Sequence, residues 1–318
     1  MTVLINLIIL LVGTYLLGEV TKKIISKLEH YTRLTHLTQF AATAFIIALA
    51  TSLPELMVSI SSSLNGLSQL AYGNAIGSNI ANISIIIGIT AVFARVLPFH
   101  HNSDPKKLFS PLFLSFVPII MALDGIVSRL DGIILLIIYI YYLKNIFSHP
   151  KPTSPKLFRP RPKLISRKSL PTLISLLFWI LILILVSQLV IIKAQFLALY
   201  FGFSITFIGF FIIAVGTSLP ELIFSLKAIK KHHPGMVTAS IIGSCVTNAT
   251  LIIGISAIIQ PIIFTGQLGI IYLSGLEYFF ILSLFILFIS TKKRLESWEG
   301  IILILIFVYY SNLELLIK

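Results

Sequence analysis

The chain has 318 residues, of which 57% are hydrophobic and only 11% are charged, and its mean hydropathy is +1.01. A water-soluble domain of this length exposes far more charge, so the composition excludes a soluble globular protein. The net charge of +13 comes from Lys and Arg residues that lie mostly between apolar segments. It indicates contact with anionic lipid head groups rather than binding of nucleic acid.

Apolar segments near the roughly 20 residues that a helix needs to cross a bilayer fill most of the chain. They predict an all-α polytopic membrane protein with ten transmembrane helices, at 3–18, 38–60, 70–94, 109–128, 132–147, 171–192, 203–226, 238–260, 269–290 and 300–316. Cytoplasmic loops carry an excess of Lys and Arg. With both termini outside, every Lys and Arg except Arg129, Lys193 and Lys318 lies on the inner side. We therefore expect a multi-pass protein of the cell (inner or plasma) membrane.

A seven-residue segment of the second predicted helix recurs in the seventh. Residues 50–56 are ATSLPEL and residues 216–222 are GTSLPEL, 166 positions later. The same offset relates 76–78 to 242–244, Asn82 to Asn248, and 86–89 to 252–255. Several matches in one register indicate an internal duplication. Because each half has five predicted helices, the second half enters from the opposite face, as the inverted repeats of secondary transporters do.

The duplication predicts three parts of the chain. A first repeat occupies 1–148, a linker occupies 149–169, and a second, inverted repeat occupies 170–318. The linker places five prolines among basic residues, namely Pro150, Pro152, Pro155, Pro160 and Pro162. Proline-rich sequence does not pack as a regular helix, so we expect an extended cytoplasmic linker.

Each copy of the repeated segment places a Pro-Glu pair inside an apolar helix. A carboxylate at membrane depth costs roughly 3 kcal/mol or more, so it normally meets a cation or a proton. Pro54 and Pro220 should free backbone carbonyls of the preceding turn, which are tolerated at that depth where they line a cavity or bind something. Glu55 and Glu221 therefore predict one shared cation site. Glu277, which has no counterpart in the first half, is interpreted as structural or protonated.

Hydroxyl and amide side chains accompany these acids. They are Ser52, Ser78, Asn82, Ser218, Ser244 and Asn248. Ser78 and Asn82 are four residues apart and share a helix face, as Ser244 and Asn248 do. Hard oxygen ligands suit calcium and also sodium, although single serines and asparagines in membrane helices serve as interhelical hydrogen-bonders about as often. The serines have no His or Lys partner in the predicted helices, so we expect neither an enzyme nor a cofactor.

At these residues the chain resembles the cation/calcium exchanger superfamily, in particular its prokaryotic sodium/calcium exchangers. The resemblance rests on TSLPEL at 51–56, GNAIGSNIAN at 73–82, GTSLPEL at 216–222 and the Gly243-Ser244 pair. It implies that Glu55 and Glu221 ligate calcium together with the backbone oxygens of Thr51 and Thr217. It also implies sodium and central sites formed by Ala48, Ser52, Ser78, Asn82, Ala214, Ser218, Ser244 and Asn248.

The second half departs from the family pattern at three places. Ala239-Ser240 stands where Gly-Asn is usual, Cys245 where Asn is usual, and Asn248 where many sodium/calcium exchangers carry Asp. The last change removes one possible negative charge from the centre, and so bears on the choice of ion.

We expect a secondary antiporter that exports Ca²⁺ in exchange for Na⁺ by alternating access, working as a monomer. The alternative is a Ca²⁺/H⁺ antiporter of the same superfamily, which Asn248 favours. A calcium-permeable channel fits less well, because a channel usually needs a symmetric oligomer around its pore.

Overall fold

The computed structural model describes residues 2–34, 51–99, 105–148, 170–230, 234–266 and 268–316. Three sequence-based expectations lie outside these residues. They are the role of Ala48, the course of the linker at 149–169, and the first part of the predicted helix at 38–60.

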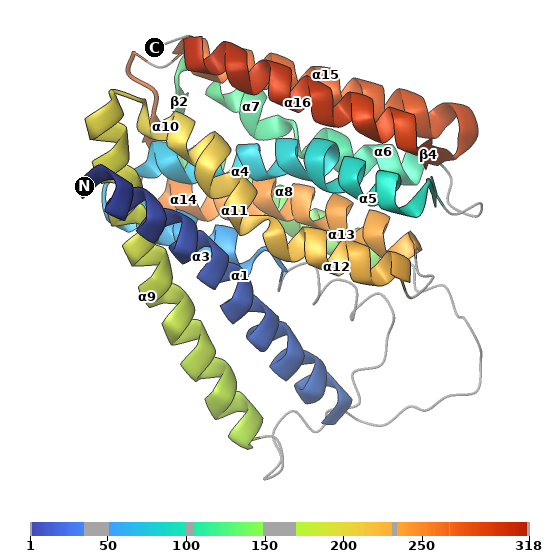
Figure 1. Ribbon diagram of the computed structural model, residues 1–318, viewed down its shortest axis with the longest axis horizontal. Coiled ribbons are helices and arrows are strands. Elements are labelled where there is room, and N and C mark those ends of the chain that lie inside the picture. The colour runs from blue at the N-terminus through green and yellow to red at the C-terminus, as the bar shows by residue number, and fades with distance from the viewer. Residues whose placement is uncertain are drawn as a thin grey trace.

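The described chain is almost entirely helical (Figure 1). The α-helices are α1 (Thr2–Leu34), α3 (Leu53–Leu64), α4 (Ser68–Ala81), α5 (Ile87–Ala94), α6 (Pro105–Leu114), α7 (Val117–Met121), α8 (Arg129–Ser148), α9 (Leu170–Phe201), α10 (Ile205–Ile208), α11 (Ala214–Thr217), α12 (Leu219–Lys230), α13 (Pro234–Val246), α14 (Ile253–Ile259), α15 (Leu268–Lys292) and α16 (Ser297–Leu316). Three π-helical segments, η1 (Asn82–Ile86), η3 (Gly209–Ile213) and η4 (Thr247–Ile252), and one 3-10 turn, η2 (Ala122–Asp124), join some of them.

Among the described residues, 6 helical stretches are long and apolar enough to cross a membrane. They are Val3–Ile24, Ser68–Ala94, Leu170–Phe201, Ile205–Lys230, Pro234–Ile259 and Leu268–Lys292. Two shorter apolar stretches, Ser110–Asp124 and Ser297–Leu313, lie where further spans are predicted. The chain is therefore a helical multi-pass membrane protein, while the full count of ten spans stays a prediction.

The first helix is longer than the sequence-based boundary of 3–18. α1 continues to Leu34, and its apolar stretch alone reaches Ile24. Glu19 and Lys22 lie just beyond the predicted end of the span. They form an ion pair along the same helix face, as residues three apart do, and the helix continues past them. No proline or glycine follows Gly18 in this helix to end it.

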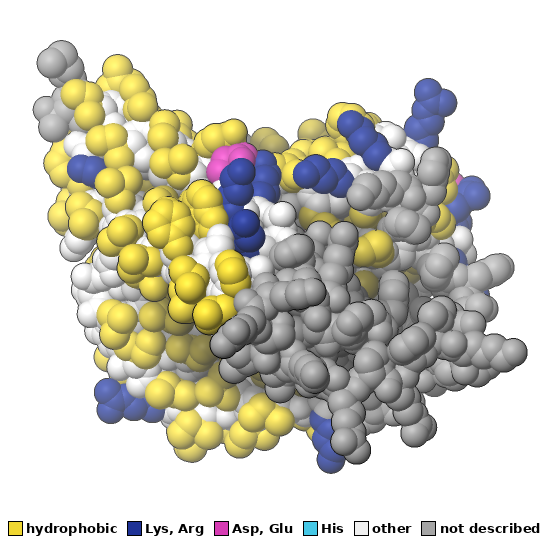
Figure 2. Space-filling view, turned by 90° about the horizontal axis from the view of Figure 1, so that it is seen from below, with side chains coloured by type: hydrophobic (Ala, Val, Ile, Leu, Met, Phe, Trp, Pro, Cys, Tyr) yellow, Lys and Arg dark blue, Asp and Glu magenta, His cyan; other side chains and the backbone are white. Residues whose placement is uncertain are grey.

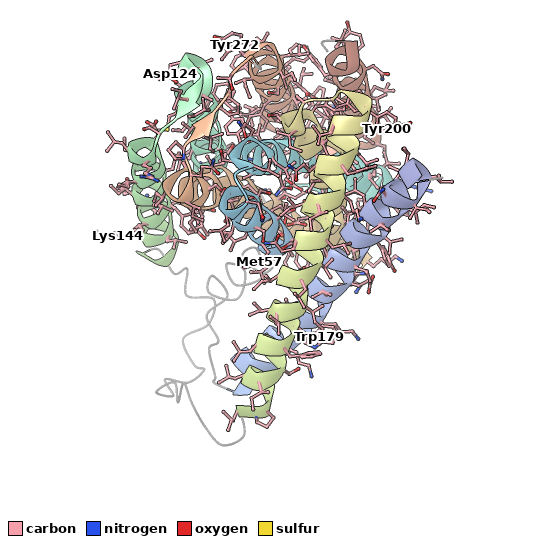
Figure 3. The ribbon with its side chains drawn as sticks, turned by 90° about the vertical axis from the view of Figure 1, so that its left-hand side faces the viewer. Met57, Asp124, Lys144, Trp179, Tyr200 and Tyr272 are labelled. Atoms are coloured by element: carbon pink, nitrogen blue, oxygen red, sulfur yellow. The ribbon has the colours of Figure 1, made fainter. Side chains whose placement is uncertain are left out.

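α1 and α9 lie side by side and project from the rest of the molecule (Figures 1 and 3). Leu10 and Leu17 of α1 pack in one buried cluster with Leu183 and Val190 of α9. The outer face of α9 is apolar and exposed, with Leu199 at 79% exposure. Figure 2 shows such hydrophobic side chains over much of one face of the protein, with Lys and Arg in a few clusters. This surface suits the hydrocarbon core of a bilayer.

Two helical stretches occupy the centre. The windows within Ser68–Ala94 and Pro234–Ile259 are 78% and 83% buried, against 28% for α9. Close approach is possible because α4 carries Gly77, where an added Cβ would lie 2.3 Å from the carbonyl oxygen of Phe210. Small residues allow membrane helices to pack backbone against backbone in this way.

Two short antiparallel ribbons join the halves of the chain. β1 (Val96–Pro98) pairs with β4 (Arg294–Glu296), and β2 (Ile126–Val127) pairs with β3 (Ile262–Ile263). In each ribbon one strand follows a central helical stretch and the other precedes a helix near the end of a half, α16 or α8. In the first ribbon the strand after the central stretch comes from the first half of the chain, and in the second ribbon it comes from the second half.

Two close contacts between helices are also related by the duplication. An added Cβ at Gly88 would lie 2.6 Å from the carbonyl oxygen of Gly300, and one at Gly132 would lie 2.8 Å from that of Gly254. Gly254 follows Gly88 by 166 positions and Gly300 follows Gly132 by 168. α5 therefore packs on α16 as α14 packs on α8.

Candidate cation site

Both Pro-Glu pairs lie in the first turn of a helix, directly after a serine that is not helical. α12 begins at Leu219 after Ser218, whose φ and ψ are −82° and 2°. α3 begins at Leu53 after Ser52, whose φ and ψ are −83° and 7°. The proline in the second position of each helix has no N–H to continue the preceding turn, and its ring crowds the carbonyl four residues back. The same local sequence thus produces the same backbone conformation before the Pro-Glu helix in both halves.

Glu55 is fully buried where three elements meet. The hydroxyl of Ser218 donates to its Oε1 at 3.4 Å. Ser78 of α4 and Thr217 of α11 also face this carboxylate, and their hydroxyl oxygens are 3.5 Å apart. The first-half acid is therefore surrounded by hydroxyls that come mainly from the second half.

Ala214 takes part through its backbone. Its carbonyl oxygen accepts from the hydroxyl of Ser78 at 3.4 Å and from that of Thr217 at 3.2 Å. This carbonyl follows the π-helical segment η3 and lies one turn before the break at Ser218. Ser78, Thr217, Ser218 and the carbonyl group of Ala214 thus lie together beside Glu55.

Glu221 is buried to 1% exposure in the same region. Its carboxylate faces Thr51 and Ser244 and lies close enough to Glu55 for the two charges to interact. Neither carboxylate oxygen has a hydrogen bond within the described part of the chain. The two acids, which are 166 residues apart in sequence, therefore share one buried environment.

Several candidate residues carry buried oxygen atoms that have no hydrogen-bond partner among the described residues. They include Ser52, Glu55 (Oε2), Asn82, Glu221, Ser244 and Asn248. Leaving a buried polar atom unpaired costs about 1–3 kcal/mol. Carboxylate, hydroxyl and amide oxygens are the donors that a hard cation uses, so the residues present fit a cation as cargo. Among the described residues no three His, Cys, Asp or Glu side chains gather as a metal centre.

The asparagines Asn82 and Asn248 lie at matching irregularities. η1 begins at Asn82 and η4 begins at Thr247, one residue before Asn248. A π-helical turn inserts an extra residue and redirects the side chains of one turn, and such turns are frequent at functional sites. Both side chains are buried, with exposures of 0% and 1%. The sequence carries no local signal for these turns.

Two further asparagines hold the site, and their roles were not assigned from the sequence. Asn74 donates from Nδ2 to the carbonyl oxygen of Glu55 and to Oγ of Ser59, both at 3.1 Å, and accepts from Thr217 at 3.2 Å. Asn79 donates to the carbonyl oxygen of Cys245 at 3.0 Å. Both belong to the GNAIGSNIAN segment at 73–82, which was the available signal.

Glu277 is buried in α15, where it precedes Tyr278, whose hydroxyl is 2.5 Å from that of Ser115. Cys245 is also buried and free, and its position against Asn79 is that of a packing residue.

Broken helices, buried paired acids and an oxygen-rich centre within a helical multi-pass protein define the class of membrane cation transporters. The model of the family described as "Sodium/calcium exchanger protein" matches residues 5–147 and 171–314. The chain belongs to this family of cation antiporters.

Individual relatives agree with the family assignment. The sodium/calcium exchanger MaX1 of Methanosarcina acetivorans is 27% identical over 346 residues, covering 96% of this chain and 97% of the relative. The inner membrane protein YrbG of Escherichia coli is 30% identical over 224 residues, or 68% of each chain. A solved structure of the sodium-calcium exchanger NCX_Mj, soaked with Na⁺ and Sr²⁺, is similar with a TM-score of 0.65 at 27% identity, covering 95% of this chain and 97% of that one.

Proposed function

We propose that the protein exports Ca²⁺ in exchange for Na⁺ by alternating access at one site between Glu55 and Glu221. The observation that carries the proposal is the meeting of these two buried acids, from matching broken helices, among unpaired oxygen atoms. Membership of the sodium/calcium exchanger family and the resemblance to NCX_Mj support it.

The proposed architecture is ten membrane helices in two inverted repeats, at 1–148 and 170–318, joined by the linker at 149–169. The paired ribbons and the two glycine contacts between helices support it, because each occurs twice, with the two halves exchanging their parts. An odd number of spans per repeat places the two Pro-Glu helices in opposite directions. Both termini then lie outside, with Lys and Arg concentrated inside.

Charge balance gives the exchange. Two ionised carboxylates balance one Ca²⁺ or two Na⁺, whereas both kinds of ion together leave excess positive charge in a medium of low dielectric constant. Calcium and sodium therefore compete for the site. Two carboxylates with no cation resist being enclosed, because burying uncompensated charge is costly. The protein then changes between its inward-open and outward-open states only when loaded.

Individual residues take the following places in this proposal. Glu55 and Glu221 bind calcium together with the backbone oxygens of Thr51 and Thr217. Sodium binds at flanking and central positions formed by Ala48, Ser52, Ser78, Asn82, Ala214, Ser218, Ser244 and Asn248. The protein works as a monomer in contact with anionic lipids of the inner leaflet.

The test is calcium flux in proteoliposomes under imposed gradients of sodium, potassium, lithium and protons, one at a time. We expect a sodium gradient to drive calcium movement and the others to fail. An exchange of more than two Na⁺ per Ca²⁺ moves net charge, so the dependence on membrane potential reports the stoichiometry. Calcium movement that ignores the sodium gradient contradicts the sodium coupling.

Asn248 favours one second candidate, a Ca²⁺/H⁺ antiporter. A neutral amide stands where many sodium/calcium exchangers carry a carboxylate, so less negative charge is available to hold several sodium ions. In this case the proton gradient drives calcium in the same vesicles, and sodium does not.

A further inference from the structure

Two polar contacts join α9 to α3, the helix that carries Met57 in Figure 3. The hydroxyls of Ser61 and Ser187, both buried, are 3.1 Å apart. Because Ser187 donates to a carbonyl oxygen of its own helix at 2.8 Å, the proton between the two hydroxyls comes from Ser61. One turn further along, the amide nitrogen of Asn65 donates to Oε1 of Gln188 at 3.0 Å. Neutral side chains thus fasten α9 to the end of α3.

The 166-residue register of the duplication extends to α1 and α9. Val20-Thr21 matches Val186-Ser187, Ile25 matches Ile191, and Lys27 matches Lys193. α1 is therefore the counterpart of α9, as α12 is of α3. The contact that corresponds to the Ser61–Ser187 pair would join Lys227 of α12 to Thr21 of α1.

Among the described residues, the second half lacks this corresponding contact. Thr21 is fully buried, and its hydroxyl has no hydrogen-bond partner within the described part of the chain. Lys227 is exposed. The other pair is also changed, since Lys22 stands in the place of Gln188 and forms an ion pair along its own helix. The two contacts that hold α9 therefore have no equivalent holding α1.

α1 packs on α12 in a different register. An added Cβ at Gly18 would lie 3.7 Å from Cγ of Pro220, so this part of α1 lies against the proline of the Pro-Glu pair. Thr21, the counterpart of Ser187, comes three residues after Gly18. The same register in the first half would place Ser187 three residues beyond the proline, but its partner Ser61 lies seven residues beyond it. The difference is about one helical turn.

Alternating access between inverted repeats exchanges the arrangements of the two halves. In the exchanged state α1 would lie on α12 as α9 lies on α3 in this structure. The duplication then brings Lys22 towards Lys231, which lies outside the described residues, in place of the bond between Gln188 and Asn65. Neighbouring like charges destabilise helices, whereas hydrogen-bonded amides stabilise them. The exchanged state therefore has less to hold it.

We propose that the Ser61–Ser187 and Asn65–Gln188 pairs form a latch on one side of the molecule, which biases the protein towards the state in this structure. The inference rests on the proposed function in that it requires alternating access, but it does not depend on which ion is coupled. The latch sets the balance between the two states through residues that lie outside the proposed cation site.

The test measures disulfide formation in membrane vesicles that carry the full-length protein with Cys245→Ala, which removes its single cysteine. Ser61→Cys with Ser187→Cys reports the state in this structure, and Thr21→Cys with Lys227→Cys reports the exchanged state. A disulfide needs its two Cβ atoms about 3.5–4.5 Å apart, so each pair reacts in its own state. We expect the first pair to oxidise about ten times faster, because each hydrogen bond shifts an equilibrium several-fold.

Gln188→Ala, combined with the second cysteine pair, removes one bond of the latch. Since one hydrogen bond between neutral groups corresponds to about fivefold in an equilibrium, the second pair should oxidise about five times faster than without this change. The matched control is Gln69→Ala. The amide of Gln69 donates to the carbonyl oxygen of Ile263 at 2.8 Å, a bond between distant parts of the chain that involves neither α3 nor α9. This control should leave the rate of the second pair unchanged.

The outcomes separate the latch from the proposed function. If the second pair oxidises at the same rate with and without Gln188→Ala, or as fast as the first pair from the start, the latch is wrong and alternating access stands. If the second pair never oxidises in any variant while the first pair does, the exchanged state is not reached, and alternating access is overturned together with the latch. Failure of the first pair to oxidise removes the contact on which the latch depends. Continued oxidation of the first pair in Gln188→Ala shows that this variant is folded.

Discussion

The two acids at the centre share one sequence motif but not one environment. Glu55 receives a hydrogen bond from Ser218, whereas Ser52, the matching residue for Glu221, has no partner for its hydroxyl among the described residues. Ser78 is bonded to Ala214, whereas its counterpart Ser244 has no partner in that part of the chain. The duplicated motif thus places a carboxylate at the same position in both halves, while the hydrogen bonds around that carboxylate differ.

The difference originates outside the motif itself. Asn74 braces the first-half acid through its backbone, and Ser240 leaves the second-half acid without that brace. Asn79 donates across the molecule to Cys245, its counterpart 166 positions later, which has no amide to return the bond. The asparagines Asn74 and Asn79 of the first half therefore make hydrogen bonds that their second-half counterparts, Ser240 and Cys245, do not make through their side chains.

The largest expected effect comes from neutralising either acid. Glu55→Gln and Glu221→Gln each remove one charge from a buried site, where losing one charged partner costs about 3–5 kcal/mol. Since about 1.4 kcal/mol is tenfold, calcium flux should fall by roughly a hundredfold or more. Flux of radioactive calcium in proteoliposomes with equal protein incorporation measures this. If only one variant loses flux, the acids do not act as a pair, and full flux in both removes them from the mechanism.

The second effect concerns the identity of the coupled ion. Asn248→Asp adds a carboxylate next to the existing pair, which favours cations of greater total charge at the centre. We expect sodium to compete with calcium at about tenfold lower concentration than in the wild type, since one added nearby charge is worth about 1.4 kcal/mol. The mirror variant Asn82→Asp is the matched control for position. An unchanged sodium dependence in both variants contradicts the central placement of the two asparagines.

The third prediction tests the frame around Glu55. Asn74→Ser gives the first half the side chain of the second and removes bonds to Glu55, Ser59 and Thr217. Leaving these buried groups unpaired should lower the free energy of unfolding by about 1–3 kcal/mol. The thermal unfolding midpoint in detergent checks this. Asn312→Ser, at an exposed position of α16, should be nearly neutral, and equal midpoints for the two variants contradict the bracing role.

Hydropathy and the position of proline predicted much of this structure. The central helical stretches lie where apolar segments were read, and both breaks fall directly before Leu53-Pro54 and Leu219-Pro220. These features were accessible because they depend on local sequence: burial of apolar side chains and the missing N–H of proline. The apolar stretch of α1 reaches Ile24, beyond the expected end at residue 18, and Glu19 and Lys22, which lie within it, pair along the helix.

Features that depend on contacts between distant residues were not predicted. The π-helical turns at Asn82 and Asn248 have no compositional signal, because they follow from how neighbouring helices pack. Likewise the bonds from Asn74 and Asn79 reach residues of other helices. The sequence located the residue types of the candidate site through its duplication, but their unequal bonding required the structure. Their role as ion ligands remains a prediction.

The smallest expected effect concerns stability at the two ribbons. Like the two acids, the ribbons occupy matching positions in the two halves but have different neighbouring residues. Asp131 accepts from the backbone N–H of Ser128 before α8, and Glu299 accepts in the same way from Glu296 before α16. The uncharged Ser128 is thus replaced in the second ribbon by Glu296. The carboxylate of Glu296 accepts hydrogen bonds from Trp298, Lys292 and Arg294, and these lower its pKa from 4.5 to about 2.

A carboxyl group whose pKa is lowered on folding stabilises the folded state above its unfolded pKa and loses this contribution as pH falls through the folded value. The contribution of Glu296 should therefore be complete above about pH 4.5 and decline between pH 4.5 and about 2. It should be small, because these charges are exposed to solvent. The difference in unfolding midpoint between wild type and Glu296→Gln, followed across this range, measures it. A difference that grows on acidification contradicts the assigned partners, since protonation makes the two side chains alike.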